Sequence, residues 1–257
     1  MNISGLAVGG DAPCRFVLEI GNAHNGSLAL AHRLIDEGSK TGAEFLKTQA
    51  YLPSELVALR GDGPAPAQWG EQGYTMRSLY ERAQTPLAWL PELFQHARDV
   101  GLVPFSSVFG LASLAALQAV NCGAYKIARL DNGHSAFIES VNATDKPTII
   151  SADHDEDCDG VVADAWLWCP KGYPADVHHS LPMFRDDETR EGWPLGLSSH
   201  CLDPRLPIAA VARGAKMIEM HVMLDDEPSA LEANISLTVT QFAQMVADVR
   251  ATEVMLG

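Results

Sequence analysis

The chain has 257 residues and a formal net charge of −15 at pH 7. Apolar residues make up 47% of it and charged residues 20%, which is a globular composition rather than a disordered or fibrous one. The acidic excess argues against nucleic acid or an anionic membrane as the main partner, because no surplus of lysine or arginine is present to meet phosphates.

Three further features indicate a cytoplasmic protein. No apolar run is long enough to span a bilayer, and the N-terminus, residues 1–5, lacks the basic region of a secretory signal. The cysteines are scattered and odd in number, without a CxxC pair, which favours reduced, buried thiols: Cys14, Cys122, Cys158, Cys169 and Cys201.

Short apolar runs alternate with longer amphipathic stretches along the chain. Eight runs have the length and composition of strands: residues 16–20, 44–49, 102–106, 124–128, 147–151, 165–169, 195–199 and 216–221. Helical patterns separate most of them, and one more follows the last: a helix that begins after the N-cap candidate Ser27, then 86–100, 111–121, 204–213 and 239–255. This alternation predicts a parallel sheet, and eight such units in this length predict a single (β/α)8 barrel over residues 1–257.

Two segments interrupt the rhythm. Residues 52–74 are rich in glycine and proline, which predicts a long irregular loop after the second strand. Residues 152–164 are acidic and leave little room for a helix, so the fifth βα unit is predicted to be degenerate.

Four charged residues stand inside the apolar strand runs, where an unpaired charge is costly: Glu19, Lys47, Lys126 and Glu219. In a (β/α)8 barrel the chemistry lies at the carboxyl ends of the strands, so these residues are candidates for a functional site. The alternative is buried Lys–Glu pairing across the barrel.

Two histidines, His200 and His221, close the neighbouring seventh and eighth strands. They are candidates to converge on one divalent metal ion, while two unrelated hydrogen-bonded histidines are the alternative. Lysine side chains and hydroxyl groups suit an anion, so a pocket is expected from Lys47, Lys126, Ser107 and Ser198. The chain has no P-loop, and no GxGxxG motif follows the first strand.

Six sequence blocks occur in order along nearly the whole chain. They are EIGNAHNGSLALAHRLID at 19–36, LKTQAY at 46–51, FSSVFGLASL at 105–114, AYKIA at 124–128, GLSSHCLDPRLPIAAVARGAKMIEMHVMLD at 196–225 and ISL at 235–237. Together they resemble the N-acetylneuraminate (sialic acid) synthase family. The resemblance implies a barrel that condenses phosphoenolpyruvate with the open-chain aldehyde of an aldose, releasing phosphate.

The resemblance also implies roles for individual residues. His200 and His221 would hold the divalent metal, usually Mn²⁺. Phosphoenolpyruvate would contact Lys47, Ser107, Lys126 and Ser198. The sugar would face Glu19, Gln49, Tyr173, Glu219 and Glu232. Four residues are candidates for catalysis: Glu19, Lys47, Lys126 and Glu219. Among them, Glu19 and Glu219 are the candidates for proton transfer and for stabilising positive charge.

The sequence departs from the family at other positions near these residues. Arg129 stands where the family has a serine, and Lys171 falls in a stretch where the family has small polar residues. Both add positive charge beside the anion pocket, which predicts substrate contacts for them and either a tighter hold on the phosphate or an additional acidic group on the acceptor. We expect an acceptor that is anionic or smaller rather than N-acetylmannosamine. The family's C-terminal antifreeze-like domain is not expected within these residues, and a homo-oligomer is possible.

Three functional hypotheses follow. The first is a metal-dependent synthase of a sialic-acid-like 3-deoxy-2-keto acid. The second is another barrel aldolase or lyase that acts on an anionic sugar, and the third is a non-catalytic barrel that binds a ligand. Phosphate release from phosphoenolpyruvate separates the first from the second, and retention of both histidines argues against the third.

Overall fold

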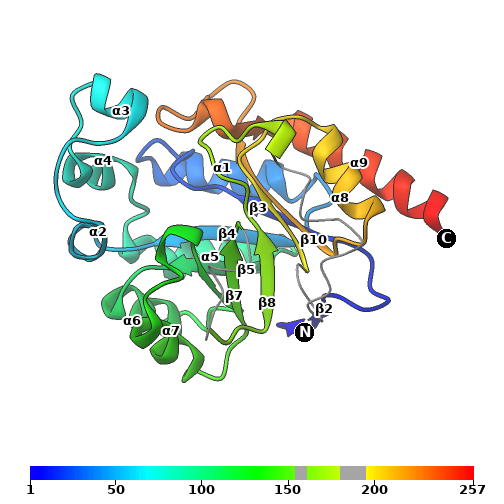
Figure 1. Cartoon of the computed structure of the whole chain (residues 1–257), viewed down its shortest axis with the longest axis horizontal. Coiled ribbons are helices and arrows are strands. Elements are labelled where there is room, and N and C mark those ends of the chain that lie inside the picture. The colour runs from blue at the N-terminus through cyan, green and yellow to red at the C-terminus, as the bar shows by residue number, and fades with distance from the viewer. Residues whose placement is uncertain (154–160, 180–194) are drawn as a thin grey trace.

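A closed parallel barrel forms the centre of the computed structural model, which describes residues 1–153, 161–179 and 195–257 (Figure 1). Its strands are β3 (Arg15–Glu19), β4 (Phe45–Ala50), β5 (Val103–Val108), β6 (Tyr125–Ile127), β7 (Thr148–Ala152), β8 (Ala165–Trp168), β9 (Gly196–Ser199) and β10 (Met217–Met223). Each strand pairs with the next, β9 pairs with β10, and β10 pairs with β3, so the ring closes. The predicted (β/α)8 barrel is confirmed, and each strand ends within two residues of its predicted bounds.

Helices cover the outside of this ring. The predicted ones are present: α1 (Leu28–Gly38), α5 (Leu90–Asp99) after the short η1 (Leu87–Trp89), α6 (Leu111–Ala119), α8 (Arg205–Ala212) and α9 (Val239–Leu256). α1 begins as expected, because the Ser27 hydroxyl accepts the Leu30 N–H at 3.3 Å. One further helix, α7 (Ser135–Asn142), follows β6 and was not predicted. None of the helices in the described ranges has the length and hydrophobicity that a bilayer span requires.

The prediction of an irregular loop at 52–74 is wrong. Figure 1 shows three helices grouped on one side of the barrel, α2 (Pro53–Arg60), α3 (Ala67–Glu71) and α4 (Met76–Ala83). Proline is compatible with the first turn of a helix, and the Glu55 carboxylate accepts the Leu52 N–H at 2.9 Å, so α2 begins despite Pro53. We call residues 52–83 the insertion.

The predicted degenerate fifth unit agrees with what the structure describes between β7 and β8. Residue 153 and residues 161–164 contain no helix, while 154–160, with Cys158 and most of the acidic run, lie outside the described residues. Smaller elements went unpredicted: β1 (Asn2–Ile3), β2 (Leu6–Ala7), β11 (Ser236–Thr238), η2 (Arg129–Asp131), η4 (Val177–His179) and η6 (Ala233–Ile235). The other four cysteines are free and buried, as expected.

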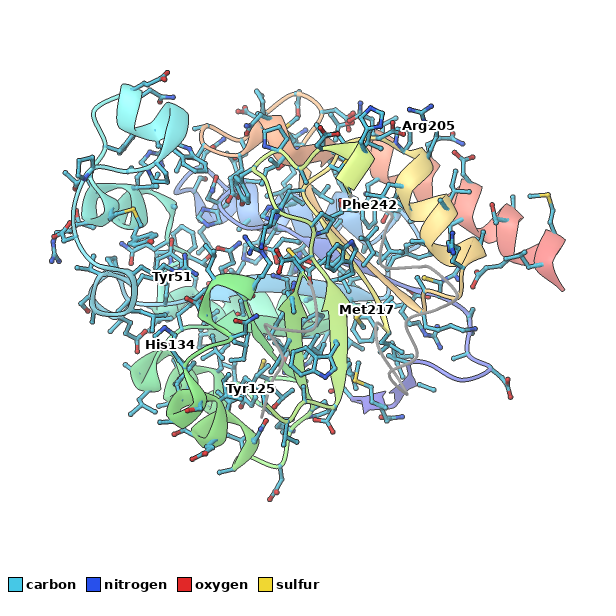
Figure 2. The ribbon with its side chains drawn as sticks, viewed as in Figure 1. Tyr51, Tyr125, His134, Arg205, Met217 and Phe242 are labelled. Atoms are coloured by element: carbon cyan, nitrogen blue, oxygen red, sulfur yellow. The ribbon has the colours of Figure 1, made fainter. Side chains whose placement is uncertain are left out.

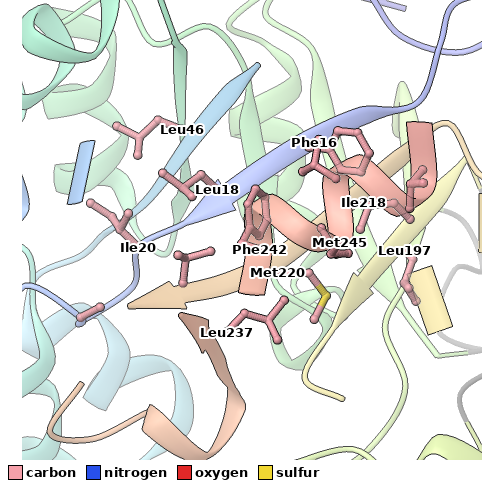
Figure 3. Close-up of a cluster of buried hydrophobic side chains, with 14 of the residues drawn as sticks. Phe16, Leu18, Ile20, Leu46, Leu197, Ile218, Met220, Leu237, Phe242 and Met245 are labelled. Carbon is pink, nitrogen blue, oxygen red and sulfur yellow. The ribbon is translucent and has the colours of Figure 1, made fainter. Parts of the chain in front are cut away.

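Two apolar clusters hold the layers together. In the first, Phe242 and Met245 of α9 pack on the outer face of β3 and β10 (Figure 3). The second contains Val17, Phe45, Phe105 and Met217, with the edge-to-face rings of Phe45 and Phe105 5.8 Å apart. Met217 lies among the strands, whereas Arg205 and His134 lie at the periphery (Figure 2). Alternate residues of each strand therefore belong to different layers.

Gly196 makes the barrel closure possible. A Cβ at this position would lie 2.1 Å from the Met217 carbonyl oxygen, which is backbone of the neighbouring strand and cannot move away. We predict that Gly196→Ala lowers the free energy of unfolding by about 1–3 kcal/mol through this overlap. Chemical denaturation measures it. Gly133→Ala is the control, since a Cβ there would meet nothing within 4 Å. Equal stability of the two variants would contradict the prediction.

Candidate active site

A layer of charged side chains lies inside the barrel, directly above the second apolar cluster. Val17, Phe45 and Met217 belong to that cluster, and the residues two positions later are Glu19, Lys47 and Glu219. Pairing aligns Glu19 with Lys47, Ser107 with Lys126 and Glu219 with Ser198 on neighbouring strands. Side chains two residues apart point to the same face of a strand, so these groups face the barrel interior like the cluster residues before them. They lie closer to the carboxyl ends of the strands, where the chemistry of such barrels takes place.

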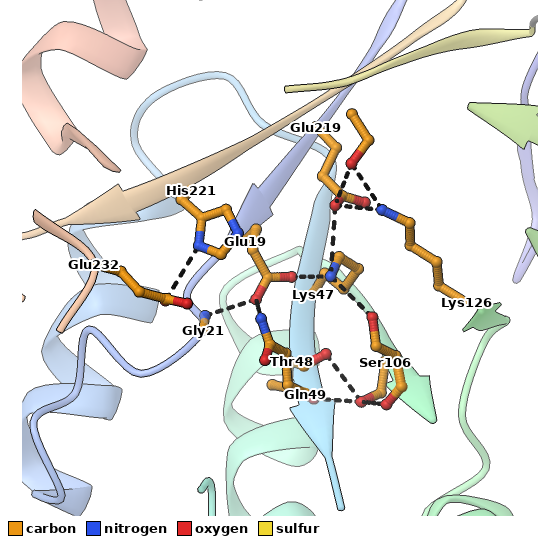
Figure 4. A network of polar contacts seen from close by, with 12 residues as sticks. Glu19, Gly21, Lys47, Thr48, Gln49, Ser106, Lys126, Glu219, His221 and Glu232 are labelled. Atoms are coloured by element: carbon orange, nitrogen blue, oxygen red, sulfur yellow. Dashed lines mark hydrogen bonds and ion pairs between the residues drawn. The ribbon is translucent and has the colours of Figure 1, made fainter. Parts of the chain in front are cut away.

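Lys47 connects two carboxylates inside the barrel (Figure 4). Its ammonium group forms an ion pair with Glu19 Oε2, lies 3.5 Å from Glu219 Oε1 and donates to the Ser107 hydroxyl at 3.1 Å. Glu19 Oε1 in turn accepts the Gly21 N–H at 2.7 Å and the Gln49 side-chain amide at 3.2 Å. The buried Lys–Glu pairing considered as the alternative is therefore present, and it includes serine hydroxyls.

Lys126 completes this network from the other side. Its Nζ lies 2.5 Å from Glu219 Oε1 and donates to Ser198 Oγ at 2.9 Å, and Ser198 Oγ donates to the same carboxylate oxygen at 3.0 Å. The other oxygen, Oε2, is buried and has no hydrogen-bond partner among the residues described. One glutamate is thus shared by two lysines through a single carboxylate oxygen.

The charges of the network follow from burial and pairing. Burial alone would raise the pKa of Glu219, but Lys126 and Lys47 outweigh it and lower that pKa to about 2. Burial alone would lower the pKa of Lys47, and the neighbouring carboxylates raise it instead. For Lys126 burial dominates, and its pKa is lowered. Glu219 is therefore a carboxylate at neutral pH.

His200 and His221 lie side by side, with ring centroids 5.3 Å apart. His221 Nδ1 lies 3.3 Å from Glu232 Oε2, and this carboxylate outweighs burial and raises the pKa of His221. Burial and the neighbouring His221 lower the pKa of His200 well below its usual value. Tyr173 joins them, because its ring lies 4.4 Å from that of His200 and its hydroxyl donates to Glu232 Oε1 at 2.9 Å.

These side chains fit a metal ion as a partial ligand set. His200 stays neutral, which is the form that binds a metal, and Glu232 orients His221 from Nδ1, as an outer carboxylate does at metal sites. In the three stretches that the structure covers, no group of three or more His, Cys, Asp and Glu side chains forms a complete site. Further ligands would have to come from water or substrate.

Gly21 makes room for this arrangement. A Cβ there would lie 2.7 Å from Glu232 Oε2 and 3.3 Å from His221 Nδ1, and the residue has a φ of 42°, which favours glycine. The close approach of the backbone after β3 thus fixes the position of the Glu232–His221 pair.

A cavity of about 410 Å³ opens above these groups. It has a polar part, formed by Lys47, Gln49, Ser107, Lys126, Arg129, Ser198, His200, Glu219, His221, Tyr173 and Glu232. It also has an apolar wall, formed by Tyr51, Leu56, Trp69, Met76, Leu79, Tyr80, Phe109 and Leu231. The structure therefore brings nearly all of the predicted site residues to one cavity. Glu19 lies fully buried beneath it, and Lys171 lies outside the lining and is mostly exposed.

The two additional cations are not free. Lys171 Nζ lies 2.5 Å from Asp153 Oδ2, and Arg129 contacts the same oxygen at 3.8 Å. Asp153 is itself buried. The sequence did not indicate this carboxylate as a partner, and it offsets part of the positive charge on which the expectation of an anionic acceptor rests.

Several cavity residues were missed from the sequence. Ser151 closes the fifth strand, lines the cavity, and has a buried hydroxyl without a hydrogen-bond partner in the part of the chain described. The expectation that functional residues lie at the carboxyl ends of the strands would have identified it. Arg60, which forms a bidentate pair with Asp131, and Trp69 come from the insertion. Both lie well beyond the end of β4, so a search of strand ends could not identify them.

This barrel fold recurs in proteins of known structure. An N-acetylneuraminic acid synthetase from Leptospira borgpetersenii superposes with a TM-score of 0.84 at 22% identity, covering 100% of this chain and 90% of that one. The spore coat polysaccharide biosynthesis protein SpsE from Bacillus subtilis superposes with a TM-score of 0.80 at 27% identity, covering 100% and 72%. Both comparisons show that the barrel fold is shared.

The NeuB family model matches residues 34–257, and this chain belongs to the NeuB family. It is 32% identical to the pseudaminic acid synthase of Helicobacter pylori, over 95% of this chain and 76% of that protein. Identity to the human N-acetylneuraminate-9-phosphate synthase is 26%, over 98% and 74%. The resemblance found in the sequence blocks is confirmed.

The loop from β3 to α1, which carries Gly21, is held by a buried histidine rather than by a cavity group. His24 Nδ1 accepts the Gly26 N–H at 3.0 Å, so its Nε2–H donates to Thr85 Oγ1 at 3.1 Å. Burial, with a smaller effect of Arg82, lowers the pKa of His24 from 6.5 to about 4. The loop therefore requires a neutral imidazole.

We predict that acid destabilises the protein through His24. Between pH 6.5 and about 4 the unfolded chain binds a proton at this residue and the folded chain does not, so stability is fully present above pH 6.5 and falls below it. The loss amounts to about 3 kcal/mol. Denaturant titrations from pH 7 to pH 4 measure it, with His24→Gln as the reference that cannot titrate. Parallel curves for wild type and variant would contradict the prediction.

Proposed function

We propose that the chain condenses phosphoenolpyruvate with the open-chain aldehyde of a sugar and consumes one water, which adds to the enol carbon as phosphate leaves, giving a pseudaminic-acid-like 3-deoxy-2-keto acid and phosphate. The observation that carries this proposal is one cavity in which the Lys47–Glu219–Lys126 network lies beside the adjacent histidines. Membership of the NeuB family and the identity to pseudaminic acid synthases support it.

The anion is bound by the lysine side of the cavity. Lys47 and Lys126 supply charge, and the hydroxyls of Ser107 and Ser198, already bonded to them, supply donors. Ser151 adds a hydroxyl that has no partner elsewhere in the described chain. These groups orient the enol of phosphoenolpyruvate so that its carbon faces the histidine side.

Charge stabilisation falls to the carboxylates. Because the pKa of Glu219 is about 2, this residue enters the reaction ionised and stabilises the positive carbon that forms when the enol attacks the aldehyde. It accepts rather than donates a proton at the outset. Burial and Glu232 raise the pKa of Tyr173 well above 10, so its hydroxyl keeps its proton and keeps Glu232 in place.

A divalent metal, Mn²⁺ in our proposal, would be held by His200 and His221. When bound, it would polarise the aldehyde oxygen as a Lewis acid. Glu232 keeps Nδ1 of His221 engaged, which leaves Nε2 for the ion. Tyr173, Glu232 and Gln49 line the same cavity, and in our proposal they contact the sugar.

The apolar wall supports an acceptor with acyl and deoxy substituents. Leu56, Met76, Leu79 and Phe109 offer contacts to methyl groups and no hydrogen bonds to extra hydroxyls. The second candidate, an anionic acceptor, is favoured by Arg129, which lines the cavity although Asp153 lies near it. A cytoplasmic location and a homo-oligomer remain predictions from the sequence.

The test is phosphate release from phosphoenolpyruvate with Mn²⁺ and a panel of aldoses. We expect an N-acylated deoxy aldose to be the best acceptor, ahead of N-acetylmannosamine and of carboxylated or phosphorylated aldoses. A best rate with an anionic aldose that Arg129→Ser abolishes would favour the second candidate. The absence of phosphate release with every aldose in the panel would contradict the proposal.

Removing the shared lysine should weaken phosphoenolpyruvate binding. We predict that Lys126→Met raises the KM for phosphoenolpyruvate by about tenfold or more, the effect of losing one charge-assisted hydrogen bond. The exposed Lys40→Met is the control and should leave KM unchanged. Thermal melting checks that both variants fold. An unchanged KM for Lys126→Met would place the anion elsewhere.

Removing one histidine should remove tight metal binding. We predict that His221→Ala weakens Mn²⁺ binding by at least about 100-fold, because a single imidazole remains. Titration of the purified protein with Mn²⁺ measures this without any substrate. The exposed His134→Ala serves as control. Equal affinities in the two variants would exclude His221 as a ligand.

A further inference from the structure

Trp69 is displayed by a small closed loop of the insertion. Pro64 and Thr75 form a β-bridge at its base, and the Met76 N–H donates to the Gly63 carbonyl at 2.8 Å. The Tyr74 N–H donates to the Trp69 carbonyl at 3.0 Å. The backbone on both sides of the indole is thus tied within the loop, so the side chain projects from a defined position.

The indole contacts two other loops of the cavity. Its Nε1–H donates to the Leu231 carbonyl at 3.0 Å, in the connection between β10 and β11. Its ring lies 5.6 Å from that of Tyr173, which follows β8, at an interplanar angle of 56°. One side chain from the β4 insertion therefore touches segments that follow two other strands.

Both residues that Trp69 contacts lie next to groups that position His200 and His221. Leu231 directly precedes Glu232, whose carboxylate holds His221, and Tyr173 lies against His200 while donating to the same Glu232. The Glu232 N–H also donates to Ser229 Oγ at 3.1 Å, so the carboxylate depends on the course of this connection. Displacing Leu231 or Tyr173 would displace the groups that orient both imidazoles.

We propose that Trp69 is a positioning residue: by holding the Leu231 carbonyl and the Tyr173 ring together, it fixes the two histidines for their ligand. These two contacts of Trp69 are independent of the proposed function, and only their consequence for metal binding and turnover rests on that function. Neither the resemblance nor the strand-end rule assigned a role to this residue.

The hydrogen bond from Trp69 to the Leu231 carbonyl distinguishes a positioning role from apolar packing alone. Trp69 also packs against the small buried cluster of Ala65, Leu79 and Leu231. Phenylalanine can fill much of that apolar contact but has no N–H to donate. Trp69→Phe therefore tests the tie, and Arg77→Gln is the matched control, because Arg77 lies on α4 of the same insertion and pairs only with exposed Asp62 among the contacts described.

The first measurement is hydrogen exchange of the amides of residues 224–235 in the free protein. We expect Trp69→Phe to accelerate their exchange about fivefold, the factor that one hydrogen bond contributes, and Arg77→Gln to leave it unchanged. Equal thermal melting of wild type and Trp69→Phe shows that the variant folds. Unchanged exchange in Trp69→Phe would overturn the proposal.

The second measurement is Mn²⁺ affinity, together with kcat and the KM for phosphoenolpyruvate. We expect Trp69→Phe to weaken Mn²⁺ binding about tenfold and lower kcat, with the KM unchanged, because the lysine side is not touched. A rise in KM without loss of Mn²⁺ affinity would overturn the positioning role. If the wild type binds no Mn²⁺, the metal in the proposed function is wrong, and the exchange result alone decides whether the tie exists.

Discussion

The Glu219 carboxylate, shared between Lys47 and Lys126, is the interaction on which the rest of the site depends. Taking such charges out of water costs several kcal/mol for each ion, and the cost is offset only when every group finds partners. Here Ser107 and Ser198 add hydrogen bonds from strands on either side, while Glu219 Oε2 is left without one among the residues described. A shift of one residue in β10 would turn Glu219 toward the helices, so the network also specifies the register of the barrel.

The fold was predictable because its signals are local. Each strand is a short apolar run, and the charges inside those runs identified the polar level of the barrel, as with Lys47 in β4 and Glu219 in β10. The sequence could not show which side chains contact one another across the barrel. It placed both lysines at one mouth, but it could not show that they share a single carboxylate, or that Asp153 would meet Lys171.

The insertion was the largest error, and its cause is physical. Glycine and proline mark turns, yet Pro53 occupies the first turn of α2, where a missing N–H costs nothing, and Gly61 ends that helix. The helices then complete the cavity with an apolar wall and with Trp69. Residues of this kind reach a site through tertiary contacts, as the bond from Trp69 to Leu231 does, and spacing along the chain gives no indication of them.

Charge balance links the two halves of the cavity. Each lysine and arginine described around it already contacts a carboxylate: Lys47, Arg60, Lys126, Arg129 and Lys171. A substrate with both a carboxylate and a phosphate would therefore enter a site without surplus positive charge. Displacing Glu19 and Glu219 from their lysines would leave two buried carboxylates unpaired, which is strongly unfavourable. A divalent cation beside His200 and His221 would supply the missing charge without that displacement. Metal and anion would then stabilise one another, and this coupling is necessarily reciprocal.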